Sequence, residues 1–153
     1  MAVQVRNTVS AVYPATAESI PLTRRWATDF LAAIGASEET TEAVRLAVSE
    51  AVTNVVMHAY ADEPGDLQVT LAVAEDELWV LISDQGRGHQ NVPETPGLGW
   101  GLALIADAAQ RFLITERSGG GTELRMRFNL TQMVPGERGA ITRADLDARP
   151  PRR

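Results

Sequence analysis

The 153-residue chain contains no cysteine and no lysine, so all 14 of its basic residues are arginines. The absence of cysteine excludes disulfide bonds, thiol nucleophiles and cysteine-ligated metals. The absence of lysine excludes a P-loop, which needs a lysine on the phosphates, and a Schiff-base enzyme, which needs a lysine amine. The chemistry of any site must therefore come from carboxylates, amides, hydroxyls, histidine or arginine.

The chain also has no apolar run close to the roughly 20 residues that span a bilayer. Its N-terminus lacks the basic segment and apolar core that mark a signal peptide. The net charge of −6 argues against a nucleic-acid-binding surface, which is normally basic. The prediction is a cytoplasmic protein that does not enter a membrane and does not bind nucleic acid directly.

Length and charge distribution predict one domain over residues 1–134 and a C-terminal tail over residues 135–153. A chain of this length can bury a single good core. Residues 1–134 carry nine arginines against seventeen acidic residues, whereas residues 135–153 carry five arginines against three. The change in composition and the proline–arginine ending predict a mobile tail.

Hydrophobic periodicity predicts the order strand, helix, helix, two strands, helix, two strands. The helices are expected over residues 17–34, from a cap at Ser37 or Thr40 to about residue 60, and over 102–109. The strands are expected over residues 6–13, 67–73, 78–83, 112–116 and 124–130. Hairpin-type connections with helices between them favour an α+β fold: a two-layer sandwich with a mixed, mostly antiparallel sheet and helices on one face.

The second predicted helix carries a polar stripe on an otherwise apolar sequence. Glu50, Asn54 and His58 are spaced four residues apart, so their side chains lie along one helix face. Polar groups among valines cost free energy unless they find partners. A core hydrogen-bond network would explain one such residue, but three in one stripe favour a metal and phosphate site.

Asp84 ends a buried-looking strand and begins the sequence Asp84-Gln85-Gly86-Arg87-Gly88. An aspartate followed by a glycine commonly marks a turn between two secondary-structure elements, so this feature alone is a weak indication of a binding site. A carboxylate here could also accept a hydrogen bond from an exocyclic amine. Gly86 and Gly88 would then let a flat ring approach the backbone.

Two further glycine clusters flank the last predicted elements. The first, at Gly97, Gly99 and Gly101, comes directly before a helix, where backbone amides bind phosphate. The second ends at Gly121-Thr122, where the threonine either donates a hydroxyl to the same ligand or only begins a strand. By spacing alone both clusters are weak signals, because flexible loops often produce them.

Taken together and in order, these pieces resemble the GHKL superfamily of ATPases and kinases, which bind ATP in the Bergerat fold. The closest resemblance is to the bacterial anti-sigma factor serine/threonine kinases. Residues 49–54 and 58–60 are similar to that family's first box, and residues 84–88 to its adenine box. Gly99-Trp100-Gly101-Leu102 is similar to the second glycine box, and Gly121-Thr122 to the last. The resemblance covers about residues 5 to 130.

The resemblance implies ATP and Mg²⁺ as ligands and assigns roles at the phosphate end of the site. Asn54 would ligate Mg²⁺ through its side-chain oxygen. Glu50 would act as general base on the attacking hydroxyl of a partner protein. Gly99 and Gly101 would offer their amides to the phosphates. His58 matches the family pattern but is expected to order the helix end.

The resemblance also assigns roles at the adenine end and on the first helix. Asp84 would hold the adenine amino group, with support from Thr122. Arg24, six residues before Phe30, would contribute to partner recognition. Two features depart from the family pattern: the segment between Gly88 and Gly97 is short, and Trp100 replaces a smaller aliphatic residue.

The implied function is an ATP-dependent serine/threonine kinase that acts as an anti-sigma factor. It would hold a sigma factor and phosphorylate an anti-sigma antagonist; a homodimer is also allowed, because related kinases commonly dimerise. The short segment after Gly88 leaves an alternative open, a nucleotide-gated binding protein without phosphotransfer. A histidine-kinase catalytic domain is less favoured, because a phosphoacceptor helical pair is missing.

Overall fold

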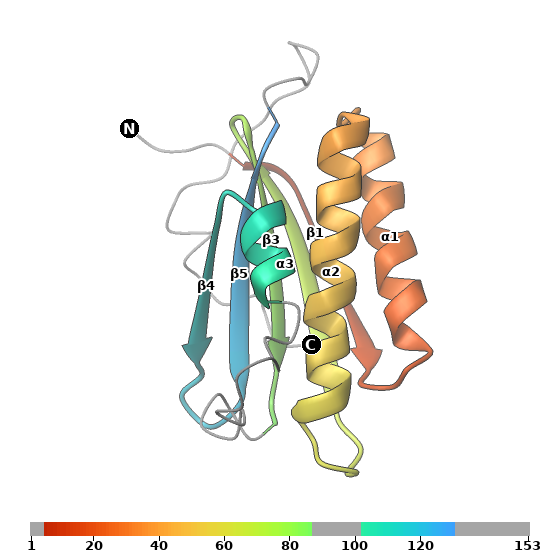
Figure 1. Cartoon of the computed structure of the whole chain (residues 1–153), viewed down its shortest axis with the longest axis vertical. Coiled ribbons are helices and arrows are strands. Elements are labelled where there is room, and N and C mark those ends of the chain that lie inside the picture. Colours follow the sequence, from red (N-terminus) through yellow and green to blue (C-terminus); the bar gives the residue numbers. More distant parts are fainter. Residues whose placement is uncertain (1–4, 87–101, 131–153) are drawn as a thin grey trace.

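A computed structural model describes residues 5–86 and 102–130 of the chain. These residues form five strands and three helices in the predicted order (Figure 1). Their bounds are β1 Val5–Pro14, α1 Ser19–Ala33, α2 Glu38–His58, β2 Asp66–Ala74, β3 Glu77–Asp84, α3 Leu102–Ala108, β4 Arg111–Glu116 and β5 Thr122–Asn129.

The five strands form one sheet in the order β1-β2-β3-β5-β4. All four pairings among the described strands are antiparallel, so the mostly antiparallel expectation holds and no parallel pair occurs in this part of the chain. The β2–β3 hairpin turns at Glu75, whose φ of +53° is left-handed. Because β5 lies between β3 and β4, its first residues lie beside the end of β3.

The three helices cover one face of the sheet and complete the α+β two-layer sandwich (Figure 1). Helix α2 packs between α1 and α3, with α1 on one side and α3 on the other. The valines and alanines that recur at helical spacing on α2 face the sheet. This buried face consists of Val44, Ala47, Val48, Ala51, Val52 and Val55.

The ends of the two long helices have the capping groups that the sequence predicts. The Ser37 side chain accepts a hydrogen bond from the Thr40 backbone N–H at 3.1 Å, which caps α2. Gly35 follows α1 with a φ of +73°, a conformation that glycine adopts without a steric penalty. These caps fix where α1 ends and α2 begins.

The element bounds differ from the predictions mainly at strand ends. Strand β5 begins at Thr122, two residues before the expected start at Leu124, because Thr122 pairs with Glu116 of β4 and Glu123 pairs with Ser83 of β3. Within the described residues, no helix is long and apolar enough to cross a membrane. The predicted tail and the segment from Gly88 to Gly101 lie outside the described residues.

Candidate functional site

Three elements end or begin at the same end of the molecule (Figure 1). They are the carboxyl end of α2, the end of β3 and the turn between β4 and β5. Helix α3 begins at this end too, at Leu102. Because antiparallel neighbours run in opposite directions, segments far apart in sequence meet here. The predicted site residues of α2, β3 and β5 lie on these elements.

Glu50 and Asn54 lie on the side of α2 that faces α3. Ala43 lines a small groove together with Ala108 of α3 and Gln110. Glu50 and Asn54 follow Ala43 by seven and eleven residues, which is two and three helical turns, so they continue along that face. The groove itself lies at the opposite end of α2 and contains none of the predicted site residues.

The polar stripe lies at the edge of the buried face of α2, not within it. Glu50, Asn54 and His58 are all half-buried, so the helix is buried on the neighbouring face only. Burial lowers the pKa of His58. Within residues 5–86 and 102–130, no hydrogen bond or ion pair engages the side chain of Glu50 or Asn54. No described residue therefore occupies these two side chains, and both can bind a ligand.

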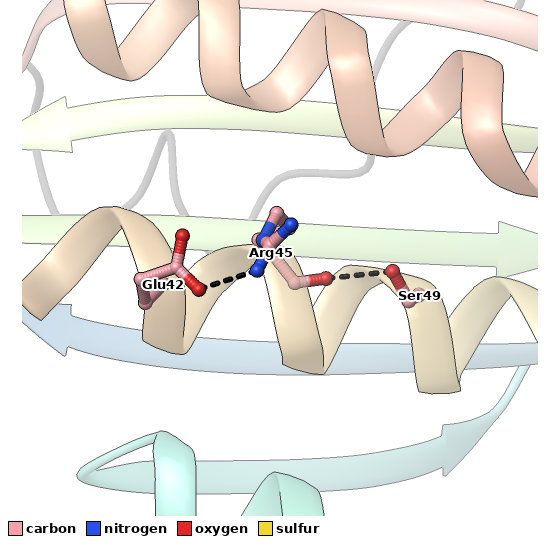
Figure 2. A network of polar contacts seen from close by, with 3 residues as sticks. All are labelled: Glu42, Arg45 and Ser49. Atoms are coloured by element: carbon pink, nitrogen blue, oxygen red, sulfur yellow. Dashed lines mark hydrogen bonds and ion pairs between the residues drawn. The ribbon is translucent and has the colours of Figure 1, made fainter. Parts of the chain in front are cut away.

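Figure 2 shows the polar contacts of Arg45, the arginine of α2. Arg45 forms an ion pair with Glu42 through Nη2 and Oε2, 2.5 Å apart, with both side chains about half exposed. The hydroxyl of Ser49 donates to the Arg45 carbonyl oxygen at 2.8 Å. These polar groups are satisfied within the helix, so the Glu50 carboxylate does not gain a counter-ion from them.

Asp84 is the last residue of β3, and only 6% of its surface is exposed. Its Oδ1 accepts hydrogen bonds from the backbone N–H of Gly86 at 2.9 Å and of Thr122 at 3.3 Å. Both donors engage Oδ1, so the carboxylate plane is fixed while Oδ2 has no donor in the described part of the chain. This leaves one oxygen for an exocyclic amine.

The ionisation of Asp84 is set by opposing effects. Burial raises the pKa of Asp84 above its ordinary value, because a charged carboxylate loses its hydration. The backbone amides of Gly86 and Thr122 and the positive charge of Arg117 act in the opposite direction. A buried carboxylate with a perturbed pKa and one free oxygen is a typical feature of a binding site.

Gly86 and Gly121 allow close backbone contacts that a side chain would block. A Cβ on Gly86 would lie 2.0 Å from the carbonyl oxygen of Ala59, at the end of α2. A Cβ on Gly121 would lie 2.0 Å from the carbonyl oxygen of Asp84, and its φ is +96°. Both glycines therefore have a steric reason that is independent of any ligand: they bring α2 and the β4–β5 turn against the end of β3.

Two residues of the site are missing from the sequence-based prediction. The Tyr60 hydroxyl accepts a hydrogen bond from the Gln85 backbone N–H at 2.8 Å and donates to the Asp66 carbonyl. Arg117 donates from Nη1 to the Asp84 carbonyl oxygen at 3.1 Å. Tyr60 lies in the segment 58–60 that resembles the family's first box, but nothing in the sequence pairs it with Gln85. Arg117 stands before the glycine triplet without any pattern that distinguishes it from a surface arginine.

The remaining predicted residues divide by location. Thr122 begins β5, and its backbone N–H reaches Asp84. Leu102 is the first residue of α3. Arg24 is half-buried in the second turn of α1, towards the end of the molecule where α2 ends. Four predicted nucleotide-binding residues lie outside the described residues: Gly88 of the adenine box, and Gly99, Trp100 and Gly101 of the second glycine box.

The donor set suits Mg²⁺ held jointly by the protein and a nucleotide. Residues 5–86 and 102–130 contain no cluster of three carboxylate or histidine side chains that would hold a metal alone. Mg²⁺ typically takes one or two protein oxygens and completes its shell with phosphates and water. The carboxamide oxygen of Asn54 is a suitable ligand of this kind, so the residues fit such an ion.

Comparison with known proteins matches most of the chain to a family of ATPase domains. The family described as histidine kinase-like ATPase domain matches residues 13–128. A serine-protein kinase RsbW of Staphylococcus epidermidis is 40% identical over 123 residues, covering 69% of this chain and 77% of the relative. An anti-sigma F factor of Clostridium acetobutylicum is 23% identical over 134 residues, covering 80% and 94%.

Two further comparisons match a smaller part of the other protein. A serine-protein kinase RsbW of Bacillus licheniformis is 37% identical over 87 residues, covering 56% of this chain and 54% of the relative. A crystal structure of the RsbU and RsbW domains of a Mycobacterium tuberculosis protein superposes with a TM-score of 0.66 at 26% identity. It covers 81% of this chain and 32% of that longer chain.

Proposed function

This chain belongs to the histidine kinase-like ATPase domain family, among relatives of the RsbW type, and on that premise we propose its function. It is an ATP-dependent protein serine/threonine kinase that acts as an anti-sigma factor. The observation that carries the proposal is the arrangement of Glu50 and Asn54 on the α3-facing side of α2, with the end of β3 at Asp84 beside the end of that helix.

Asp84 holds the adenine ring in this proposal. Its Oδ1 is occupied by two backbone amides, so Oδ2 accepts the hydrogen bond from the 6-amino group of adenine. The glycine at position 86 lets the backbone lie against the end of α2. The ring is therefore recognised by a fixed carboxylate, and the phosphates extend along α2 towards Asn54 and Glu50.

Glu50 is the general base. Its carboxylate, with no partner among the described side chains, accepts the proton of a serine or threonine hydroxyl on the partner protein. The hydroxyl oxygen forms the new bond to the γ-phosphorus as the bond to the β–γ bridging oxygen breaks, and ADP leaves with that electron pair. Half-burial suits this role, because the acceptor must reach Glu50 from outside.

Asn54 is proposed to hold Mg²⁺ through its side-chain oxygen. When bound, this ion neutralises charge on the phosphates during transfer. Asn54 lies one helical turn beyond Glu50, so the metal ligand and the base act on the same phosphoryl group from one rigid element. The two residues have separable roles, one in nucleotide binding and one in proton transfer.

The partners are a sigma factor, which the protein sequesters, and an anti-sigma factor antagonist, which it phosphorylates. A phosphoryl group adds about −1.5 to −2 charges to the antagonist, which is enough to disrupt a complementary interface. Arg24 on α1 is proposed to contact a partner protein. The curated relatives include proteins named for both activities, a serine-protein kinase and an anti-sigma F factor. A homodimer is part of the proposal.

The test is transfer of label from [γ-³²P]ATP, with Mg²⁺, to candidate antagonist proteins encoded by neighbouring genes. The proposal predicts phosphoserine or phosphothreonine on one antagonist, lost in the Glu50→Ala variant. Binding of ATP with no transfer to any antagonist tried would replace the kinase with a nucleotide-gated sequestering protein. Label on histidine would instead indicate a histidine-kinase domain.

A further inference from the structure

Arg117 lies in the turn between β4 and β5 and is fixed there by its own backbone. Its N–H donates to the Gly121 carbonyl oxygen at 2.9 Å, and its carbonyl oxygen accepts from the Gly120 N–H at 3.1 Å. The turn also contains three successive glycines with positive φ, Gly119 to Gly121. The arginine therefore projects from a turn with a defined shape.

The Arg117 side chain reaches across to the end of β3. Its Nη1 donates to the Asp84 carbonyl oxygen at 3.1 Å, while its Nε is buried and has no acceptor in the described part of the chain. A buried donor without an acceptor lowers stability. The hydrogen bonds of the Arg117 guanidinium therefore do not by themselves explain why an arginine lies at the predicted nucleotide site.

Arg117 is also the positive charge that faces the Asp84 carboxylate. The titratable groups coupled to Asp84 in the described residues are Arg117, from the β4–β5 turn, and the Tyr60 hydroxyl, from the end of α2. Burial raises the pKa of Tyr60, so this hydroxyl stays neutral between pH 5 and 8. The backbone amides of Gly86 and Thr122 lower the pKa of Asp84 most, and Arg117 is the charged side chain among the described residues that adds to their effect.

We infer that Arg117 is a positioning residue for nucleotide selection: it holds the Asp84 peptide in place and keeps the Asp84 carboxylate in its acceptor form. The inference rests on the proposed function, in which Asp84 binds adenine. It adds a residue outside the glycine boxes to the machinery that distinguishes one purine from another.

The chemistry of the purines explains the selection. Adenine carries an amino group at position 6, which donates to a carboxylate, whereas guanine carries a carbonyl, which accepts. An ionised Asp84 accepts from adenine and repels the guanine carbonyl. A protonated Asp84 can donate to that carbonyl, so loss of the facing charge should weaken the preference for ATP.

The experiment measures the dissociation constants of MgATP and MgGTP between pH 5 and 8 by isothermal titration calorimetry. The proteins are the full chain, Arg117→Gln, Arg117→Lys, Asp84→Asn and the double variant Asp84→Asn/Arg117→Gln. Each variant is compared with the unmodified chain at the same pH, which removes the titration of the phosphates themselves. Circular dichroism checks folding.

Arg117→Gln is expected to weaken ATP binding roughly tenfold at pH 7, the size of one lost hydrogen bond from a charged group. The pH at which ATP affinity falls on acidification should move upwards, and the ATP/GTP affinity ratio should decrease. Arg117→Lys should restore the pH profile, because it restores the charge. In the Asp84→Asn background, Arg117→Gln should no longer change the pH profile.

An equal loss for ATP and GTP at every pH, in both Arg117→Gln and Arg117→Lys, would overturn the inference and leave a merely structural arginine. Unchanged binding in Arg117→Gln would also overturn it. If Arg117→Gln does not fold, Arg117→Met, which keeps the aliphatic part of the side chain and removes the charge, takes its place in the same comparison. Absence of ATP binding by the unmodified chain, or unchanged ATP binding in Asp84→Asn, would refute the proposed function instead.

Discussion

Replacement of Gly121 by alanine tests whether the β4–β5 turn must lie directly against the end of β3. The added Cβ would lie 2.0 Å from the Asp84 carbonyl oxygen and 2.7 Å from the Gln85 Cα, so backbone must move. The φ of +96° is also unfavourable for alanine. We expect Gly121→Ala to lower the free energy of unfolding and to weaken ATP binding, since the displaced backbone carries Asp84.

The magnitude follows from two separate terms. A positive-φ conformation costs a non-glycine residue about 1–3 kcal/mol. Steric overlap that forces backbone shifts adds about 1–3 kcal/mol. Gly119→Ala is a matched control, because its φ is +91° and a Cβ there meets nothing within 4 Å. Gly119→Ala should therefore show only the cost of the positive φ, without the steric overlap, and leave ATP affinity unchanged.

Urea unfolding at pH 7 measures the free energy of unfolding of both variants, and calorimetry measures their ATP affinity. The expected order of stability is unmodified chain, Gly119→Ala, Gly121→Ala, with a gap of about 1–3 kcal/mol between the two variants. Equal losses in both variants would refute the close contact between the turn and β3. So would normal ATP binding by a folded Gly121→Ala protein.

Three further predictions concern single side chains. Asp84→Asn should weaken ATP binding yet raise the free energy of unfolding near pH 7. Burial raises the pKa of Asp84 in the folded protein, so its ionised form destabilises the fold at neutral pH. The neutral asparagine does not carry this cost, and protonation removes the cost from the aspartate at low pH. The stability gap between the two proteins should therefore close as pH falls below the ordinary aspartate range, which pH-dependent urea unfolding measures; a gap that grows on acidification would contradict this sign. Ser37→Ala should cost about 1 kcal/mol in urea unfolding, because it removes the N-cap of α2, and should leave ATP affinity unchanged because the cap is at the other end of the helix. Tyr60→Phe removes the acceptor of the Gln85 N–H and should cost about 1–3 kcal/mol with a matching loss of ATP affinity, whereas an unchanged protein would show that this hydrogen bond is dispensable.

The sequence predicts the fold well because the relevant signals are local and periodic. The stripe of valines and alanines on α2 indicates a helix with one buried face, and Ser37 marks its start. The order of strands and helices is confirmed, as is the covering of one sheet face. The strand order is not visible in the sequence, because it depends on β5 pairing with β3 across the chain.

The candidate site is only partly predictable, because some of its contacts join residues that are far apart in the sequence. Asp84 stands out because it follows a buried strand and precedes glycines, and Glu50 and Asn54 stand out because they are polar at helical spacing. Arg117 and Tyr60 act through backbone atoms of residues 33 and 25 positions away in sequence. Every residue type has such backbone atoms, so no pattern of side chains in the sequence predicts the hydrogen bonds of Arg117 and Tyr60.

The most direct test of the proposed kinase separates ATP binding from phosphotransfer in Glu50→Gln. Single-turnover transfer from [γ-³²P]ATP to the unphosphorylated antagonist is measured beside the dissociation constant of MgATP. Removing a general base should slow transfer by roughly 10²–10⁴-fold, while ATP affinity changes little, because Asp84 and Asn54 are intact. Transfer at the rate of the unmodified chain would contradict the role of Glu50, and a parallel loss of ATP affinity would show that this carboxylate serves nucleotide binding instead.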